Sequence, residues 1–592
     1  MAQWLLYKLD FKEGRIRVKN FSQKYSLDRI FPLIAIFISI LAMFINIFFG
    51  FDVHHDGLSL STLILTKEAL LGSGPYPFNQ YGPAWTIPYV PISLLIPIES
   101  LYLAARLFTF VVYLATGIVL YNLAQHFTRT SRNVPLLTVL IFACSHPFYN
   151  DLGSSFVVWP SSINMFLMAL ISLRVIKTFE EPGNNRNLIF IGILCAFIFL
   201  IRIQIGVLMF FTLLLIFFFR TRYRESLPFA IAFTSTLSSF FIFLFIKGWF
   251  GSYWTDSILF PFTYISGDKS TYPRPYFTIA ISAFFVGLFI VLNIINIKRS
   301  QIFALILVGV ATITISMLFL LNTRDLDLLY STIILQRRFI VSFFISSFVF
   351  YSLLYLLRNK SGLKYRMSQD CDFAKTLSLI AISGVGLIQT WPLFDQMHAW
   401  WAFSPGFVLA AITCVSLAKN ISLTPRLRSF SVWCVTFTLL IPMILGSVKL
   451  MGKNYSLDHS YIMRFILVPE TQAGEMRKLG EFLNTTVPRQ SKILNLCENS
   501  DVFLQESRFL SQTGYFVFWA PMSRFGSITE SLQTTSDFDY VLTCSMNQVP
   551  KLRTQNNLVM NEMFSQVLEL NSKLELAGSI SSQGRIWKIY NK

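Results

Sequence analysis

The chain has 592 residues, of which 54% are hydrophobic, 16% are aromatic and only 14% are charged. Because a soluble globular protein carries about 25% charged residues, this composition excludes a chain of ordinary soluble domains. The formal net charge of +18 would suit nucleic acid, but the lysines and arginines lie mostly in short clusters between apolar runs. That distribution sets the topology of a membrane protein, so we expect membrane lipids and no nucleic acid among the partners.

The first 30 residues are basic and polar, and an apolar run follows them. This order predicts a cytoplasmic N-terminus over 1–30 and a first span that serves as an uncleaved signal anchor. About thirteen runs are expected to cross the bilayer as helices of roughly 20 residues. The pair within 188–219 could instead form one broken helix, which would change the parity. The expected spans lie near 31–50, 101–122, 134–148, 162–178, 188–201, 204–219, 228–246, 276–297, 302–321, 339–357, 375–389, 403–418 and 430–447.

Basic clusters support this map, because the cytoplasmic loops of membrane proteins are enriched in Lys and Arg. With the N-terminus inside, every second loop should be basic, and the loop at 177–187 is the weak case. An odd number of spans places 448–592 outside, so the spans form a transmembrane domain over 31–447. We expect a multi-pass protein of the plasma membrane, which in a bacterium is the inner membrane. The basic clusters fall at 129–132, 220–224, 298–299, 358–366 and 419–428.

The segment 448–592 differs from the rest, because charged residues return and no run is long enough to span. The pattern predicts a small α/β domain, so the fold class is an all-α polytopic membrane protein with a small C-terminal extracytoplasmic α/β domain. Cys497 and Cys544 could form a disulfide outside the cell or remain two buried thiols. The expected strands are Lys492–Glu498, Phe538–Cys544 and Arg585–Tyr590, and the expected helices are Thr471–Leu483 and Asn557–Asn571.

The first outer loop, 51–100, opens with two acids and two histidines within five positions, Asp52, His54, His55 and Asp56. A carboxylate here could act as a general base that takes a proton from an acceptor hydroxyl. Together with the histidines it could hold a divalent metal cation, with His55 and Asp56 as ligands. The structural alternative is that Asp56 caps the helix that follows it. The two roles are compatible, because capping fixes a carboxylate in place.

The loop continues with a predicted surface helix over Leu58–Leu71 and a turn-rich stretch that ends Gln80-Tyr81-Gly82-Pro83. The aromatic rings of this stretch could line a sugar site, although such rings are equally common at membrane interfaces. Ala84–Ile98 is apolar but contains three prolines, which predicts a short interfacial helix rather than a span.

This order of features resembles the GT-C superfamily of membrane glycosyltransferases, which includes protein O-mannosyltransferases and the aminoarabinose transferases that modify lipid A. The features are an acid just after the first span, a surface helix, a Gly-x-Pro-Tyr and a Gly-Pro before an interfacial segment. The His-His-Asp-Gly and Gln-Tyr-Gly-Pro variant is similar to a bacterial envelope branch. The resemblance covers the first loop and the general layout of the spans.

The resemblance implies an acid of this loop as the catalytic base, and by position we assign the role to Asp56, with Asp52 as the competitor. It also implies substrate contacts for His54, His55, Gln80 and Tyr81. Relatives often carry two adjacent acids where this chain has His55 beside Asp56, which leaves the requirement for a metal open.

Arg202-Ile203-Gln204 lies between two apolar runs, and an arginine there is costly unless it reaches an interface or a partner. By resemblance Arg202 contacts the phosphate of the lipid carrier, with Gln204 as a further substrate contact. Arg202 could equally extend to the lipid head groups. Arg337 and Arg338, in a mixed-charge outer loop, are secondary candidates for phosphate.

Asp395 and His398 are three residues apart within a tryptophan-rich outer segment, so one helical turn would place them on the same face. The pattern also resembles the GT-C branch, and we interpret it as acceptor or carrier recognition rather than an interfacial aromatic belt.

The function expected from the sequence is transfer of a hexosyl or pentosyl group from a polyprenyl-phosphate carrier to an envelope glycan, lipid or protein acceptor outside the membrane. The resemblance implies inversion at the anomeric carbon. The alternatives are a transporter or flippase of an envelope lipid, and an enzyme of the O-antigen ligase or polymerase type. A transporter is disfavoured because transporters place charged residues within spans and often show paired broken helices. This chain concentrates its acids and histidines in the predicted outer loops and shows no clear internal duplication.

Overall fold

The computed structural model describes the helical and strand segments of the chain and a few isolated positions between them. These segments are 27–51, 55–71, 82–127, 133–146, 156–220, 223–259, 344–352, 370–390, 396–420, 454–457, 464–489, 491–495, 538–546, 574–582 and 585–592.

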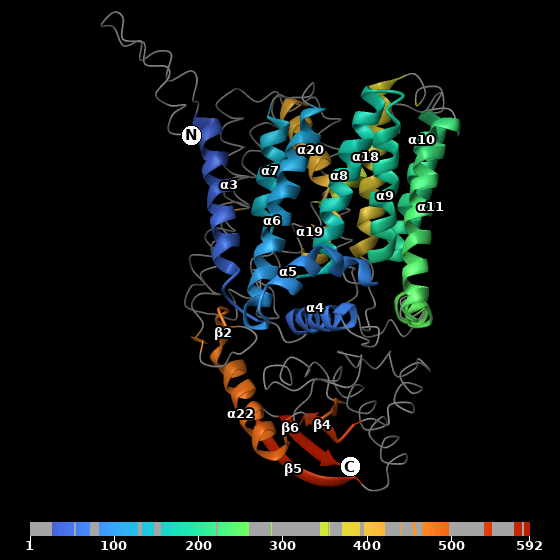
Figure 1. The fold of residues 1–592 in the computed structure, drawn as a ribbon. Helices are drawn as coiled ribbons and strands as arrows, with labels where there is room; N and C mark the ends of the chain where they lie inside the picture. Colours follow the sequence, from blue (N-terminus) through green and yellow to red (C-terminus); the bar gives the residue numbers. More distant parts are fainter. Residues whose placement is uncertain are drawn as a thin grey trace, which may run out of the picture.

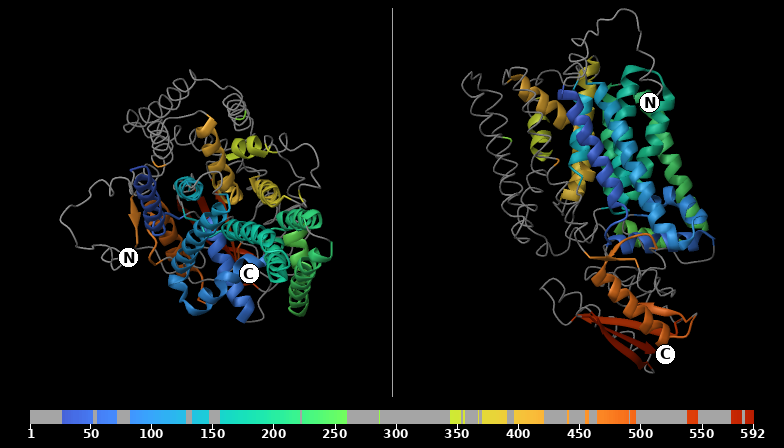
Figure 2. Two further views of the ribbon diagram at one scale, coloured as in Figure 1. Left: turned by 90° about the horizontal axis from the view of Figure 1, so that it is seen from above. Right: turned by 90° about the vertical axis from the view of Figure 1, so that its left-hand side faces the viewer.

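Upright helices form a bundle that makes up most of the described molecule (Figures 1 and 2). They coincide with nine of the expected spans, although several begin or end some residues away from the expected limits. The expected spans at 276–297, 302–321 and 430–447 lie almost wholly outside the described residues, and 339–357 lies there in part. The helices are α3 (Leu27–Asn46), α6 (Ile98–Gln125), α7 (Val134–Cys144), α8 (Pro160–Glu180), α9 (Asn185–Ile201), α10 (Ile203–Arg220), α11 (Tyr223–Ile246), α18 (Cys371–Leu387) and α20 (Gly406–Asn420).

Four of the described helical segments are long and apolar enough to cross a membrane: Ile98–Gln125, Pro160–Glu180, Ile203–Arg220 and Ser226–Ile246. Their burial differs with position in the bundle. In the apolar window of α8, 78% of residues are buried, against 17% in that of α11. Since both windows are apolar, α8 is the central helix, and α11 presents the kind of outer surface that suits lipid.

The chain reverses between α9 and α10, which excludes one continuous broken helix. Arg202 is the only residue between the two helices. A Cβ on Gly206 would overlap the backbone of Phe199, so the two helices lie in close contact directly after the turn. The sequence allowed either arrangement, and the alternative of one broken helix is wrong.

The lower end of the bundle in Figure 1 is closed by short elements that lie across it: α4 (His55–Leu71), the 3-10 helix η1 (Pro83–Tyr89) and α5 (Val90–Leu95). The surface helix expected over Leu58–Leu71 therefore begins three residues earlier. The interfacial segment forms a 3-10 turn followed by a short α-helix, because its prolines lack the amide donors that a continuous helix needs.

The C-terminal segment joins the bundle at this lower end. The Gly50 amide donates to the Leu467 carbonyl oxygen at 2.9 Å, and the Leu467 amide donates to the Phe48 carbonyl oxygen at 2.8 Å. The segment that follows α3 and the C-terminal segment therefore meet at the same end of the bundle. The N-terminal end of α3 lies at the opposite side (Figure 1).

The C-terminal segment contains a small sheet with one helix against it. Strand β3 (Ile493–Asn495) pairs in parallel with β4 (Tyr540–Met546). Strand β6 (Arg585–Asn591) pairs antiparallel with β4 and with β5 (Glu575–Ser582), which gives the order β3-β4-β6-β5.

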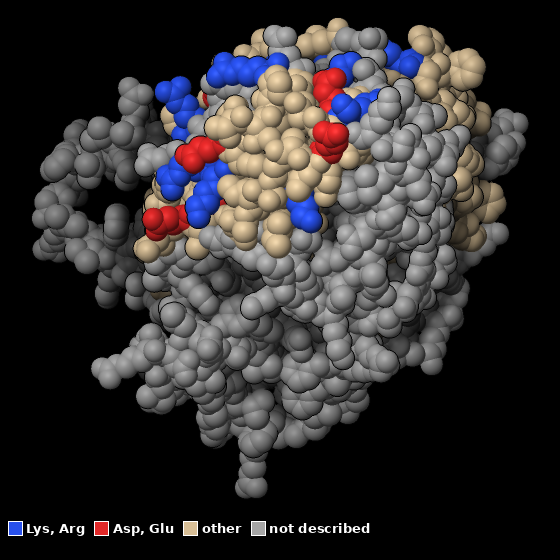
Figure 3. Space-filling model, turned by 90° about the horizontal axis from the view of Figure 1, so that it is seen from below, with Lys and Arg blue, Asp and Glu red and all other residues tan. Residues whose placement is uncertain are grey.

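Helix α22 (Glu470–Thr486) and strands β3, β4 and β6 match the expected elements. Strand β5 and the two-residue strands β1 (Tyr455–Ser456) and β2 (Val468–Pro469) were not expected from the sequence. The expected helix Asn557–Asn571 lies outside the described residues. Acidic and basic side chains are interspersed on the described surface seen in Figure 3. Helix α22 contributes exposed residues of both signs, Arg477, Lys478 and Glu481. A mixed-charge face of this kind suits water rather than lipid.

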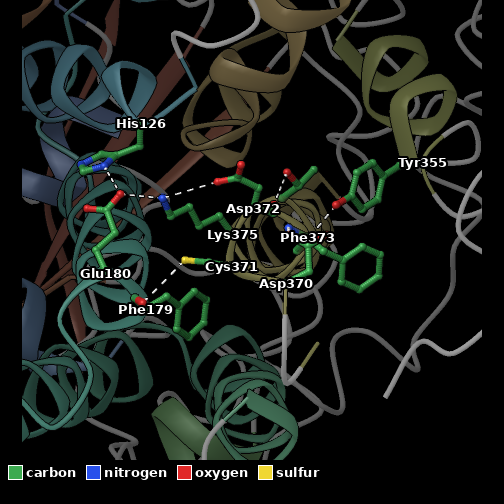
Figure 4. A network of polar contacts seen from close by, with 10 residues as sticks. His126, Phe179, Glu180, Tyr355, Asp370, Cys371, Asp372, Phe373 and Lys375 are labelled. Carbon is green, nitrogen blue, oxygen red and sulfur yellow. Dashed lines mark hydrogen bonds and ion pairs between the residues drawn. The ribbon is translucent and has the colours of Figure 1, made fainter. Parts of the chain in front are cut away.

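At the upper end, ion pairs tie three helices together (Figure 4). Glu180, the last residue of α8, accepts from Lys375 Nζ of α18 at 2.6 Å and from His126 Nδ1, just after α6, at 2.9 Å. Asp370 caps α18 by accepting from the Phe373 amide at 3.0 Å. These contacts fix the ends of α6, α8 and α18 relative to one another, far from α4.

Candidate functional site

Asp56 lies in the first turn of α4 and is fully buried. Its Oδ1 accepts a hydrogen bond from the Tyr102 hydroxyl, and its Oδ2 accepts from Arg106 Nη2 at 3.0 Å. Both partners come from α6. The carboxylate predicted to be catalytic is therefore held by two side chains and carries its negative charge beside a guanidinium.

Arg106 is fully buried as well and joins three parts of the chain. Besides Asp56, it donates from Nη1 to the Ile47 carbonyl oxygen at 2.9 Å and from Nη2 to the Gly50 carbonyl oxygen at 2.8 Å. Its guanidinium carbon lies 5.0 Å from the centre of the Tyr102 ring, within the range of a cation–π contact. Arg106 thus connects the end of α3 to the start of α4 and balances a buried charge that would otherwise be strongly destabilising.

Sequence reasoning missed Tyr102 and Arg106. The signal for Arg106 was present, because it is a lone cation within the apolar run at 101–122. The rule that drew attention to Arg202 applies equally to it: an arginine inside an apolar run has a partner or a function. Tyr102 gives no comparable signal, since tyrosine is common near the ends of spans.

Gly82, within the Gln-Tyr-Gly-Pro motif, packs against the end of α9. A Cβ at this position would overlap the Leu200 carbonyl oxygen and lie 3.6 Å from Cε2 of Tyr253. The φ angle of Gly82 is 76°, in the left-handed region that favours glycine. Burial raises the pKa of the Tyr253 hydroxyl well above its usual value, so this group remains protonated. The glycine of the motif thus packs against the end of α9, close in sequence to Arg202.

Arg202 is half-buried and lies at the turn between α9 and α10. Its Nη2 donates to Ser161 Oγ at 2.6 Å, at the N-terminus of α8. The α8 N-terminus is also tied to α4, because Ser59 Oγ donates to the Val158 carbonyl oxygen. Arg202 and Asp56 therefore belong to the same end of the bundle and connect through neighbouring residues of one segment, 158–161.

The second predicted outer motif connects to the same helix end. His398 lies in α19 (Gln396–Ala402), and its ring meets that of Trp401 edge-on, with centroids 5.7 Å apart. Trp401 Nε1 lies 3.3 Å from the Tyr113 hydroxyl, which is 2.9 Å from Ser162 Oγ. Ser162 is the neighbour of Ser161, so this contact chain leads from His398 to the residue beside the one that Arg202 contacts.

An apolar cavity of about 280 Å³ lies between α4, the η1–α5 segment and α11. Its far wall includes Leu244 and Trp249, which pack in one cluster with Ile203, the residue after Arg202. Lys247 Nζ lies 5.7 Å from the centre of the Trp249 ring. The cavity thus adjoins the cluster that contains Ile203, the residue after Arg202. Its lining is Thr66, Ala69, Leu70, Thr86, Ile87, Val90, Phe240, Phe243, Leu244 and Trp249.

Several predicted site residues lie outside the described residues, so their roles remain predictions. They are Asp52, His54, Gln80, Tyr81, Arg337, Arg338 and Asp395. His55 is the first residue of α4, and Gln204 is half-buried in the first turn of α10. Among the residues that the structure describes, no group of three or more His, Cys, Asp or Glu side chains could hold a metal ion.

No protein-family model and no curated protein matches the chain. Among solved structures, three glycosyltransferases are similar to the chain over most of its length. The oligosaccharyltransferase AglB from Archaeoglobus fulgidus, in complex with an inhibitory peptide and a dolichol-phosphate, is 11% identical. The match covers 96% of this chain and 74% of AglB, at a TM-score of 0.47.

Two further structures are similar over most of this chain. The arabinofuranosyltransferase AftD from Mycobacteria is 12% identical, with 96% of this chain and 40% of AftD covered and a TM-score of 0.43. ArnT from Cupriavidus metallidurans is 10% identical, with 94% of this chain and 97% of ArnT covered and a TM-score of 0.39. AglB, AftD and ArnT are GT-C glycosyltransferases, the superfamily that the first outer loop resembles. Because each TM-score is below 0.5, these similarities alone assign no function to the chain.

Proposed function

We propose that the protein transfers a sugar from a polyprenyl-phosphate carrier to an acceptor hydroxyl at the end of the bundle that carries α4. The acceptor is an envelope glycan, lipid or protein outside the membrane. The observation that carries the proposal is the buried Asp56–Arg106 pair, with an N···O distance of 3.0 Å. Within the membrane domain an ionised carboxylate is costly and is usually retained for function.

In the proposed reaction the Asp56 carboxylate accepts the proton of the acceptor hydroxyl. The oxygen of that hydroxyl attacks the anomeric carbon while the bond from this carbon to the phosphate oxygen breaks, and the electron pair stays on the phosphate. Because the carboxylate is fully buried, acceptor binding has to open a path to it.

Arg202 and the apolar cavity support a lipid-linked donor. A guanidinium can bind a phosphate with two parallel hydrogen bonds, and Arg202 lies at the turn where the outer ends of α9 and α10 meet. The adjoining cavity is lined almost wholly by apolar atoms, which suits the hydrocarbon chain of a carrier. A soluble nucleotide sugar would have no use for such a surface.

The reading that competes with this proposal is that Asp56 only anchors α4 to α6. In that case another group, such as Asp52, is the base. A single Asp56→Asn substitution does not separate the two readings, because it also leaves the Arg106 charge buried without a counter-charge. Removing one partner of a buried ion pair costs about 3–5 kcal/mol, so inactivity could reflect loss of folding.

The test therefore compares Asp56→Asn, Arg106→Gln and the double variant that carries both. Each is introduced into a strain lacking the gene, and both membrane yield and envelope glycans are measured. We expect the double variant to regain yield, because both charges are gone, while transfer stays about a hundred- to ten-thousand-fold below wild type. Restored transfer in the double variant would reduce Asp56 to an anchor. Asp52→Asn is the companion variant that would then identify the base.

A further inference from the structure

One stripe of α8 connects Arg202 to a buried glutamine. Ser161, Asn164 and Met168 are spaced by three and four residues, so they lie on the same side of the helix. Arg202 Nη2 donates to Ser161 Oγ at 2.6 Å at the outer end of the stripe. Gln389 Nε2 donates to Met168 Sδ at 3.4 Å at its inner end. Asn164 lies between these two contacts.

The amide groups on this stripe have unused hydrogen-bonding atoms. Asn164 is 0% exposed and Gln389 is 5% exposed. Within the described part of the chain, three atoms of these side chains lack a hydrogen-bond partner: Nδ2 and Oδ1 of Asn164, and Oε1 of Gln389. An unsatisfied buried polar atom is destabilising, and native proteins retain few of them. Two such side chains, one on the central helix α8 and one in contact with it, therefore indicate a polar ligand.

We infer that the stripe binds the sugar of the lipid-linked donor, with the phosphate at Arg202 and sugar hydroxyls at Asn164 and Gln389. This inference rests on the proposed function and names a subsite for it. A hydroxyl both donates and accepts, and so does a side-chain amide. From Ser161 to Met168 the helix rises about 10 Å, a length comparable to that of a phosphate and a sugar ring together. The unbranched thioether of Met168, between the two amides, can change rotamer to admit the ring.

The inference predicts opposite effects on stability and binding. Asn164→Leu and Gln389→Met keep the approximate shape of each side chain and remove its unsatisfied polar atoms. Both variants should therefore unfold in detergent at the same temperature as wild type or at a higher one. The matched control is Ser378→Ala, since Ser378 Oγ of α18 is also buried without a partner among the described residues but lies outside the stripe.

Binding is measured on the purified full chain with farnesyl phosphate alone and with farnesyl phosphates that carry glucose, mannose, galactose or arabinose. For wild type we expect one of the sugar-bearing probes to bind more tightly than farnesyl phosphate. That gain should fall by about tenfold or more in Asn164→Leu and Gln389→Met, given two or three lost hydrogen bonds. Affinity for bare farnesyl phosphate should stay within about twofold in both variants, and Ser378→Ala should match wild type.

Two results of the binding measurement would overturn the inference: no sugar-dependent gain in affinity with any probe, or an unchanged gain in both amide variants. A clear loss of stability in Asn164→Leu would also overturn it, because the amide would then be serving the fold. The proposed function is tested separately with bare farnesyl phosphate. It fails if this probe does not bind to wild type, or if it binds as tightly to Arg202→Gln as to wild type.

Discussion

Gly82 has both a backbone conformation and a close contact that disfavour any side chain. Its φ of 76° is strained for any side chain, and a Cβ would in addition overlap the Leu200 carbonyl oxygen. Gly183 is a matched control, since its φ is 90° but nothing lies within 4 Å of a Cβ there. We expect Gly183→Ala to cost about 1–2 kcal/mol for the backbone alone and Gly82→Ala to cost clearly more. Thermal unfolding in detergent measures both, and equal costs would mean that the contact with α9 yields easily.

His398 allows a test of the second outer motif. Its ring lies against Trp401, which leads through Tyr113 to the α8 N-terminus. We expect His398→Ala to raise KM more than it lowers kcat, because the residue recognises a substrate rather than reacting with it. Asp395→Asn should behave in the same way, a prediction that rests on the sequence pattern. A fall in kcat at constant KM would instead assign these residues to the chemical step.

The sequence predicted acids and arginines for the site from their position next to spans, and it gave no sign of the partners that come from distant segments. Asp56 stands out because it follows the first apolar run. The contact of its carboxylate with α6 depends on the packing of elements about fifty residues apart in the chain, which no local pattern encodes. The environment of Asn164 could not be predicted from the sequence either, because a polar residue in an apolar run does not reveal whether a partner meets it in the fold.

Among the elements, helices were predictable and short strands were not. Apolar runs indicated α6, α8, α10 and α11 because lipid requires long apolar helices. Strand β5, Glu575–Ser582, lies at the edge of the sheet, and most of its side chains are exposed or half-buried. It is rich in Gly, Ser and Ala, so its sequence lacks the alternation of apolar and polar residues that identifies a strand. It forms because β6 beside it pairs through its whole length.

The ion pairs at the upper end of the bundle make an element-scale prediction. Lys375 is 8% exposed and contacts Glu180, which ties α18 to α8 (Figure 4). Lys375→Met removes the lysine charge and leaves Glu180 with His126, whereas Lys375→Met with Glu180→Gln removes both charges. We expect the single variant to lower the free energy of unfolding by about 1–3 kcal/mol and the double variant to recover part of the loss. Additive losses would show that the two side chains do not interact.

The described N-terminal end of α3 and the C-terminal sheet lie at opposite ends of the bundle (Figures 1 and 2). The sequence predicted that they lie on opposite sides of the membrane, because basic loops alternate with polar ones. The predicted site residues Asp56, Arg202 and His398 all belong to the end that carries the sheet. Which face of the membrane that end occupies stays a prediction, and the cysteines can test it.

Cys544 is disulfide-bonded, while Cys144, Cys195, Cys371 and Cys414 are free. We predict that its partner is Cys497, which lies outside the described residues. Strands β3 and β4 pair in parallel with Asn495 opposite Leu542, and the two cysteines each follow that pair by two residues in the sequence. Continuing the register would bring them face to face.

A disulfide persists in an oxidising compartment, so the bond and the topology are tested together. In intact cells an impermeant maleimide should label Cys497 and Cys544 only after mild reduction, and Cys497→Ser should expose Cys544 to the reagent without reduction. Cys371, at the opposite end of the bundle, should react only after the cells are permeabilised. Labelling of Cys371 in intact cells, with Cys544 protected until permeabilisation, would invert the topology. The site would then face the cytoplasm, where a donor on the outer leaflet could not reach it.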